Sequence, residues 1–289
     1  MSKPTVLIAG CGFVGLAAAR LFHREGWEVT GCTHSVESAE ALSSEPFQVR
    51  SCDIAERHSV ERHRDLHGLD VVIHCASSGR GGADQYRSVY LEGARNLADV
   101  LTPRLLIFTS STSVYAQTDG GWVTEESPAD PDRETGRVLR ETEDLVCARG
   151  GIAARLAGIY GPGRSVLLKK FFSGEAVIEG DGRRWINQIH RDDVAGALHT
   201  LATKRVPGVF NVADDLPIAQ RELYAWLSEW FGHPLPPTGP IDPNRKRGWT
   251  HKQVSNARLR ELGWIPGYPS FFDAVERDHG LIAALETRD

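Results

Sequence analysis

The chain has 289 residues, with 33 Lys and Arg against 38 Asp and Glu, so its formal net charge is −5 at pH 7. Charged residues make up 25% and apolar residues 41%, an ordinary mixture for a protein with a buried core, which excludes disorder and collagen-like repeats. The acidic balance offers no basic field to a phosphate backbone, so we expect no nucleic-acid partner. Apolar runs fall short of the roughly 20 residues that span a bilayer, and the first residues lack a signal-peptide layout, so we expect a cytoplasmic protein without a membrane partner.

The cysteines and histidines predict no metal site. Five cysteines are an odd number without a C-x-x-C pair, so we expect reduced thiols rather than disulfides or zinc ligands. Residues 57–67 place three histidines and three arginines in one predicted helix. Their spacing offers no obvious third ligand, so a solvated, mixed-charge helix face is favoured over a metal site.

Short apolar strands alternate with helices along most of the chain. Strands that are apolar on both faces and separated by helices predict a parallel sheet covered on both sides. The predicted strands are residues 5–9, 28–32, 49–52, 71–74, 105–109, 153–159 and 208–212, and the predicted helices are 14–24, 37–42, 86–101 and 136–148.

This alternation predicts an α/β fold: a Rossmann doubly wound parallel sheet with a small C-terminal substrate lobe. Residues 1–160 would form the NAD(P)-binding domain, with its sheet completed by about residues 187–214. From residue 162 onward Gly and Pro become dense, and helices and loops replace the strict alternation. We therefore assign residues 161–186 and 215–289 to the smaller lobe, over the carboxyl ends of the strands where open α/β sheets bind ligands.

A G-x-G-x-x-G motif lies between the first strand and the first helix, at Gly10, Gly12 and Gly15. The first glycine permits a tight turn, the second lets a pyrophosphate approach the backbone, and the third lets helix and strand pack closely. In this context the motif predicts a dinucleotide site, against the alternative of a turn that only packs a helix. The residues assigned to the cofactor here are Gly10, Cys11, Gly12, Phe13, Val14 and Gly15.

The end of the second strand favours NADP over NAD. NAD-binding sheets normally carry a carboxylate there for the ribose hydroxyls. This chain has Thr33, His34 and Ser35 instead, which leave no carboxylate to repel a 2′-phosphate and supply hydrogen-bond donors. An arginine is missing from these positions, so we expect only a modest preference.

Several segments together resemble the extended short-chain dehydrogenase/reductases, the NAD-dependent epimerase/dehydratase family, in the same order along nearly the whole chain. The G-x-G-x-x-G spacing and the helix sequence GRVL further resemble the atypical, YeeZ-like branch of that family. The matching segments are residues 71–76 (VVIHCA), 109–115 (TSSTSVY), 155–163 (RLAGIYGPG), 180–194, 210–214 (FNVAD) and 258–266 (RLRELGWIP).

The resemblance implies further cofactor contacts. Asp53 would hydrogen-bond the adenine amino group with Ile54 beside the ring, although an acidic residue after a strand can instead only cap the next helix. A loop and a strand end would border the pyrophosphate, ribose and nicotinamide. These implied residues are Cys75, Ala76, Ser77, Thr109, Ser110 and Ser111.

One departure from the family concerns its chemistry. In the family a Y-x-x-x-K pair exchanges a proton with the substrate while hydride moves to or from the nicotinamide. Aligning residues 136–143 with that helix places Thr135 at the tyrosine and Leu139 at the lysine, and the chain has no lysine between Lys3 and Lys169. The resemblance therefore implies cofactor binding more strongly than epimerase, dehydratase or reductase turnover.

Ser111 and Tyr115 remain as catalytic candidates. They would share one face if the chain stays extended, so Tyr115 either borders the nicotinamide pocket or only helps to shape it. By the resemblance, Tyr160, Arg164 and His190 border the substrate, with Arg164 suited to a phosphate or carboxylate. For Arg164 the alternative is a solvated loop, and for His190 a position before a helix capped by Asp192 or Asp193.

Two classes of function follow. The first is an NADP- or NAD-dependent oxidoreductase or isomerase that acts on a small polar, nucleotide-sugar-like substrate without the usual Tyr/Lys pair. The second is a catalytically inactive NADP-binding sensor or interaction protein. The resemblance also implies a homodimer, since members of the family often pair through helices.

Overall fold

The computed structural model describes residues 3–79, 81–242 and 249–286. Within these residues seven parallel strands form one sheet in the order β3-β2-β1-β4-β5-β7-β12, which confirms the predicted doubly wound fold. The chain order reverses between β1 and β4, so the ligand crevice of such sheets lies at their carboxyl ends. The strands are β1 (Thr5–Ala9), β2 (Glu28–Thr33), β3 (Gln48–Ser51), β4 (Val71–His74), β5 (Leu106–Ser111), β7 (Ile152–Leu156) and β12 (Gly208–Val212).

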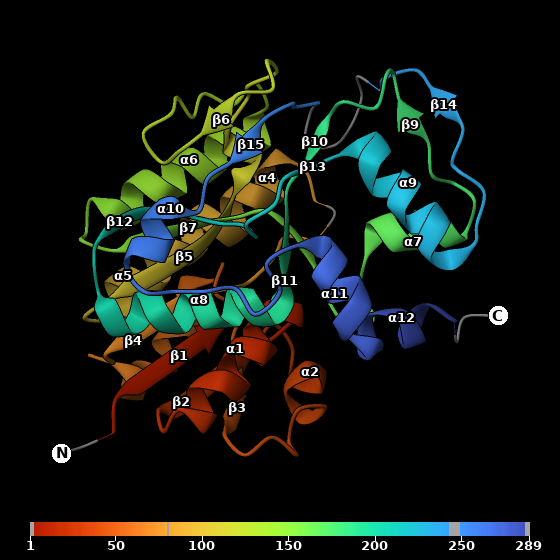
Figure 1. Cartoon of the computed structure of the whole chain (residues 1–289). Coiled ribbons are helices and arrows are strands. Elements are labelled where there is room, and N and C mark those ends of the chain that lie inside the picture. Colours follow the sequence, from red (N-terminus) through yellow and green to blue (C-terminus); the bar gives the residue numbers. More distant parts are fainter. Residues whose placement is uncertain (1–2, 80, 243–248, 287–289) are drawn as a thin grey trace.

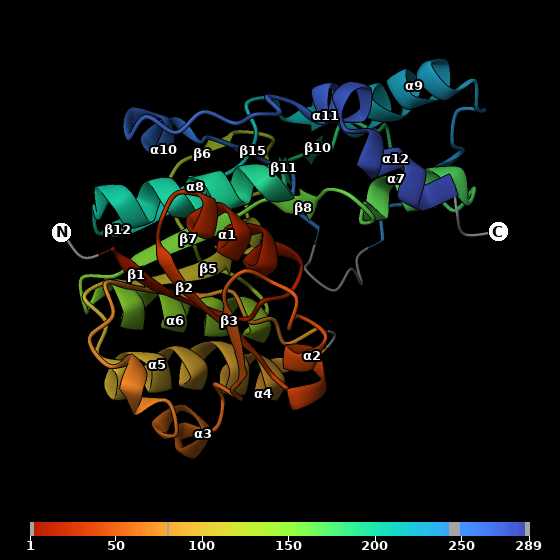
Figure 2. The same ribbon diagram turned by 90° about the horizontal axis from the view of Figure 1, so that it is seen from below.

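Helices cover both faces of the sheet. Figure 2 shows α1 (Phe13–Arg24) and α8 (Arg191–Lys204) on one side, and α5 (Gly93–Leu101) and α6 (Glu134–Cys147) on the other. The central strands between them are almost wholly buried, because helices keep both faces of a parallel sheet from water, whereas the edge strand β3 is exposed or half-buried.

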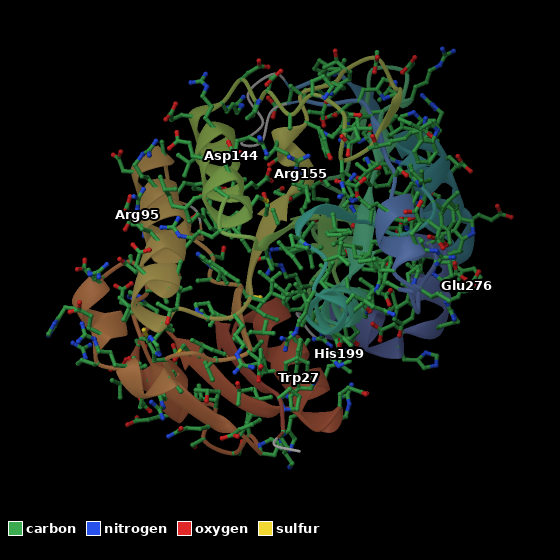
Figure 3. All side chains as sticks on the ribbon, turned by 90° about the vertical axis from the view of Figure 1, so that its left-hand side faces the viewer. Trp27, Arg95, Asp144, Arg155, His199 and Glu276 are labelled. Carbon is green, nitrogen blue, oxygen red and sulfur yellow. The ribbon has the colours of Figure 1, made fainter. Side chains whose placement is uncertain are left out.

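Aromatic side chains pack α1 and the residues after it against α8. The Phe22 ring centroid lies 5.1 Å from that of His199, and Trp27, just after α1, lies 6.2 Å from the same ring. Trp27 and His199 are seen next to each other in Figure 3. This contact fixes α8 over the first βαβ unit.

Two predicted elements differ in detail. The helix predicted at 86–101 begins as α4 (Ala83–Tyr86) and continues through a π-helical stretch, Arg87–Glu92, into α5. The strand predicted at 153–159 is divided, because Gly158 leaves β7 and starts β8 (Gly158–Tyr160), which pairs with β11 (Gln188–His190). A Cβ at Gly158 would lie 3.0 Å from the carbonyl oxygen of Asn187, so only glycine permits this close approach.

A second hydrophobic cluster lies at one side of the sheet, on the right in Figure 1. It packs Tyr160 against the helices that follow. The boundaries predicted for the two parts of the chain stay a prediction, and residues 1–2, 80, 243–248 and 287–289 of those parts lie outside the described residues. The helices of this cluster are α7 (Val166–Phe172), α9 (Gln220–Phe231), α11 (Phe271–Arg277) and α12 (His279–Glu286).

Short elements complete the fold. The parallel pairing of β15 with β6 brings the chain near residue 252 back to the loop that follows β5. Among the described helices, none is long and apolar enough to cross a membrane. These elements are α2 (Val36–Glu40), α3 (Arg57–Glu61), α10 (Ala257–Glu261), β6 (Trp122–Val123), β9 (Ile178–Glu179), β10 (Trp185–Ile186), β13 (Ile218–Ala219), β14 (Thr238–Gly239) and β15 (Gln253–Val254).

Candidate functional site

The three glycines of the first turn have different structural roles. Gly10 has φ +104°, and a Cβ there would lie 2.4 Å from the backbone nitrogen of Ala76. A Cβ at Gly15 would lie 2.0 Å from the carbonyl oxygen of Gly10. A Cβ at Gly12 would meet nothing within 4 Å. Gly10 and Gly15 are therefore required by the fold itself, whereas Gly12 keeps open space at the start of α1.

The open space at Gly12 lies at the N-terminus of α1. Gly12 is the N-cap of α1 and has no side chain to bind the first N–H groups of the helix. These donors and the helix dipole favour an anion at this end. The turn itself is held to β2, because the backbone N–H groups of Gly10 and Cys11 both donate to the carbonyl oxygen of Cys32. The residues present thus fit a pyrophosphate.

The end of β2 presents fewer free donors than its sequence suggests. The Thr33 hydroxyl is buried and donates to the carbonyl oxygen of Ser35, 3.1 Å away. Ser35 caps α2, and its Oγ accepts from the backbone N–H of Ser38. His34 is exposed, with its Nδ1 3.6 Å from Oδ2 of Asp53. Of the three predicted residues, His34 is the one whose side chain is open to a ligand.

Asp53 does not cap the next helix, so that alternative is wrong. The N-cap of α3 is Glu56, whereas Oδ1 of Asp53 accepts from the backbone N–H of Ala55 at 3.0 Å. Ile54 is buried, and a Cβ at Gly93 would lie 2.9 Å from its Cδ1. Asp53 therefore keeps a half-buried carboxylate near His34, and Ile54 packs against the following helix layer.

The serines of β5 lie on opposite sides of the strand. Ser110 is buried and donates to Oε1 of Glu143 at 2.5 Å, on the α6 side. The Oγ of Ser111 accepts from the backbone N–H of Ser113, and the Thr109 hydroxyl donates to the carbonyl oxygen of His74. The structure therefore does not bring Ser110 and Ser111 together, because successive strand residues alternate faces.

Tyr115 does not continue the strand from Ser111. A 3₁₀ turn, Thr112–Val114, intervenes, and Tyr115 is fully buried. Its hydroxyl donates toward the carbonyl oxygen of Thr124 and Oδ1 of Asn211, both at 2.9 Å, and accepts from Arg155 at 2.7 Å. Burial raises the pKa of the phenol against the opposing effect of Arg155. The shared face predicted for Ser111 and Tyr115 is wrong, and the tyrosine serves a buried hydrogen-bond network.

That network centres on a buried ion pair. Both oxygens of Glu143 accept from Arg155, with Nη2 to Oε2 at 2.7 Å, and Arg140 also binds Glu143. Arg155 lies beside α6, the helix that carries Asp144, in Figure 3. Because both charges are paired and hydrogen-bonded, the pair is tolerated without water. The inner face of α6 thus joins β5 and β7.

A pocket of about 320 Å³ opens at the first turn of α6. Its walls include Ser113, Thr135 and Leu139, so the two positions aligned with the family's catalytic pair lie at one cavity. Trp249 and Thr250 close it from the distant C-terminal part, and the indole Nε1 of Trp249 is buried without a hydrogen-bond partner among the residues that the structure describes. The other lining residues are Tyr86, Ala116, Pro131, Asp132, Arg133 and Gly136.

The predicted substrate residues separate into two environments. Tyr160 and His190 are fully buried, and within the described part of the chain the phenol Oη of Tyr160 has no hydrogen-bond partner. Nδ1 of His190 accepts from the backbone N–H of Asp192, while its Nε2 lies 3.0 Å from Oδ2 of Asp278. His190 itself therefore caps α8, which corrects the prediction of an aspartate cap. Arg164, by contrast, is exposed.

Asp193, the third residue of α8, binds the C-terminal segment instead of capping its own helix. Its Oδ1 accepts from the backbone N–H of Gly267 at 2.6 Å and its Oδ2 from that of Tyr268 at 3.0 Å. This carboxylate ties the C-terminal segment to α8 rather than satisfying the end of its own helix.

The histidine-rich stretch forms α3 and a 3₁₀ turn, Arg64–Leu66, instead of one helix. Nε2 of His63 lies 3.0 Å from the carbonyl oxygen of Ser51, and Nε2 of His67 lies 2.6 Å from the Thr102 hydroxyl. In the part of the chain that the structure describes, no three His, Cys, Asp or Glu side chains gather as metal ligands would.

Sequence reasoning missed Lys252. Its ammonium is buried and donates to the carbonyl oxygen of Tyr115 at 2.8 Å, across 137 residues of sequence. Burial lowers the pKa of this lysine to about 8, with a smaller contribution from Arg184. A local motif could not have revealed this contact, because it depends on the pairing of β15 with β6.

Comparisons with known proteins agree with this geometry. A family model described as the NAD dependent epimerase/dehydratase family matches residues 6–213. Protein YeeZ of Escherichia coli K12 is 30% identical over 277 residues, which cover 91% of this chain and 96% of YeeZ.

Two solved structures extend the likeness to the whole fold. A candidate NAD-dependent epimerase/dehydratase from Methylobacillus flagellatus superimposes with a TM-score of 0.79 at 29% identity, over 99% of this chain and 100% of that one. A double mutant of dTDP-glucose 4,6-dehydratase from Streptomyces venezuelae, with NAD bound, has a TM-score of 0.79 at 20% identity over 98% and 97% of the two chains.

Proposed function

The chain belongs to the NAD dependent epimerase/dehydratase family, and from this premise we propose that it binds NADP or NAD and acts as an oxidoreductase or isomerase on a small polar substrate. When bound, such a cofactor supplies hydride transfer at its nicotinamide. The observation that carries the proposal is the open space at Gly12, because the flanking glycines are filled by the fold and this one is not. Space and donors coincide there, as a pyrophosphate requires.

The pocket at α6 is the substrate site in this proposal. Its volume of about 320 Å³ lies at the lower end of the range of roughly 300–1,000 Å³ for small-molecule sites. The hydroxyls of Ser113 and Thr135 and the indole N–H of Trp249 offer hydrogen bonds, while Leu139 offers an apolar wall. This mixture suits a polar molecule with an apolar edge, such as a sugar ring.

Proton transfer in this pocket would proceed without the family's usual pair. Thr135 is a far weaker acid than a phenol, and Leu139 has neither charge nor donor. Ser111, whose Oγ accepts from the backbone N–H of Ser113 on the pocket wall, remains as the residue proposed to orient a substrate oxygen. The proposal therefore takes the substrate itself or a non-standard group as proton donor.

A second candidate function is a nucleotide-binding sensor without turnover. The engaged hydroxyl of Tyr115 favours it, because this phenol already has three partners and a raised pKa. Such a protein would bind the cofactor and change its contacts with a partner according to the redox state.

Hydride exchange separates the two functions. The protein is incubated with stereospecifically deuterated NADPH and a panel of carbonyl compounds that includes nucleotide sugars, and label transfer is followed by mass spectrometry. Stereospecific label transfer to one compound supports the enzyme. Tight NADPH binding without transfer to any member of the panel supports the sensor, and absence of NADPH and NADH binding overturns both.

A further inference from the structure

Two arginines from separate segments converge on the first side chain of α1. The guanidinium carbon of Arg164, in the turn between β8 and α7, lies 5.0 Å from the ring centroid of Phe13. That of Arg191, the first residue of α8, lies 5.2 Å from the same centroid. Gly161 permits this approach, since a Cβ there would lie 3.0 Å from Cβ of Arg191 and 3.4 Å from Cζ of Phe13.

The positive charge at this ring is poorly balanced. Arg191 binds Oδ1 of Asp192 at 2.8 Å, in a pair whose carboxylate side chain is 53% exposed. Arg164 has no ion pair within residues 3–79, 81–242 and 249–286. Cation–π contact attracts each guanidinium to the ring but does not remove their mutual repulsion. The positive end of the α1 dipole, at Gly12 and Phe13, adds to the same field.

We propose that Arg164 and Arg191 bind a phosphate group beside Phe13, and that the phosphate belongs to the pyrophosphate of the dinucleotide. This inference rests on the proposed function. Phe13 directly follows Gly12, so both guanidinium groups converge on the residue next to the open space for an anion. A phosphate between them would accept charge-assisted hydrogen bonds and offset the repulsion of two like charges. The second possible source of a phosphate is the substrate.

The arrangement also joins two parts of the molecule. Arg164 lies in the turn that precedes α7, and Arg191 is the first residue of α8, which packs against α1. A phosphate held by α1 and by both arginines would link the turn before α7 to these two helices. Cofactor binding would then order the substrate side before a substrate arrives.

The test measures binding rather than turnover. NADPH is titrated by tryptophan fluorescence against the wild-type protein, Arg164→Gln, Arg191→Gln and the double variant, at low and high salt. Arg183→Gln is the matched control, because Arg183 is an exposed arginine that is paired with Asp181 between β9 and β10 and does not contact Phe13. Inorganic pyrophosphate is titrated in parallel against each protein saturated with NADPH, which isolates a phosphate site that the cofactor does not fill.

We expect each single variant to weaken NADPH about tenfold, the double variant to weaken it further, and the salt dependence to fall with each lost charge. Unchanged NADPH binding together with lost pyrophosphate binding in the saturated protein supports the phosphate site with the substrate as its source. Variants that leave both titrations unchanged overturn the inference while the proposed function stands. A wild-type protein that binds no NADPH or NADH overturns the proposed function itself.

Discussion

Helix α1, with the turn that begins it, and helix α6 cover opposite faces of one sheet, and the two regions differ in how their space is filled. At the turn, a side chain at Gly12 would have open space, and the first N–H groups of α1 have no side-chain cap. Beyond its first turns, the inner face of α6 is filled, because Glu143 is buried and bound by Arg155, whereas Thr135 and Leu139 line the pocket. In the proposed function, cofactor binding and proton transfer would therefore depend on different residues of one fold.

The largest effect expected from this contrast is on turnover. The wild-type protein should not interconvert UDP-glucose and UDP-galactose at ordinary enzyme rates, since losing one positioned acid–base group costs about 10² to 10⁴ in rate. The measurement is a coupled assay of UDP-galactose, with Thr135→Tyr/Leu139→Lys as the variant that restores both groups. Wild-type rates of about 1 s⁻¹ or more would show that these positions do not matter here.

Breaking the buried ion pair between Glu143 and Arg155 should cause a large loss of stability. Glu143→Gln should lower the free energy of unfolding by about 3–5 kcal/mol, because it leaves Arg155 buried with its charge uncompensated. Glu141→Gln is the matched control on the same helix, and its exposed pair with Arg87 should contribute less than about 1 kcal/mol. Urea denaturation measures both, and equal losses would contradict a structural role for the buried pair.

The open turn predicts a loss of binding without a loss of fold. Gly12→Val should weaken NADPH at least about 100-fold, which is roughly 2.7 kcal/mol, because its side chain would occupy the open space. Its melting temperature should stay near the wild-type value. Gly15→Ala should do the reverse and lower the melting temperature, since its Cβ would lie 2.0 Å from the Gly10 carbonyl oxygen. Normal NADPH binding by Gly12→Val would place the phosphate elsewhere.

Replacing Tyr115 tests whether its buried hydrogen-bond network with Arg155 and Asn211 takes part in the reaction. Tyr115→Phe removes a partner from Arg155 and Asn211 and should lower the free energy of unfolding by about 1–3 kcal/mol. NADPH affinity and any hydride exchange should be unchanged, because the phenol is buried away from solvent. A variant of normal stability that had lost hydride exchange would instead identify the tyrosine as the acid.

The smallest effect concerns cofactor choice. His34→Asp should move the ratio of NADPH to NADH affinity toward NADH by about threefold to tenfold, since a carboxylate at the end of β2 repels a 2′-phosphate and accepts from ribose hydroxyls. The control is His58→Asp, an equally exposed histidine on α3. Fluorescence titration gives both ratios, and a wild-type preference for NADH would contradict the predicted NADP preference.

Much of the fold was predictable because it depends on local requirements. A tight turn after a strand requires glycine at Gly10, and the third glycine must leave room for close helix–strand packing, so the spacing alone located the glycine turn between β1 and α1. The alternation of apolar strands and helices predicted a strand at each of the seven positions of the main sheet, and six of the seven agree to within about two residues at each end. The exception is the strand at 153–159, whose division at Gly158 depends on the approach of Asn187.

The candidate site was predictable only where it is built from one segment. The sequence by itself determined the family, the glycine turn at Gly12 and the absence of a lysine from α6, since each of these can be recognised within a short segment of sequence. Tertiary structure alone decided that Tyr115 is buried, that His190 caps α8, and that Lys252 reaches the loop after β5. It also decided that Arg164 and Arg191 share the ring of Phe13. These contacts join segments far apart along the chain, and hydrophobic periodicity specifies which face of an element is buried but not which distant side chain packs against it.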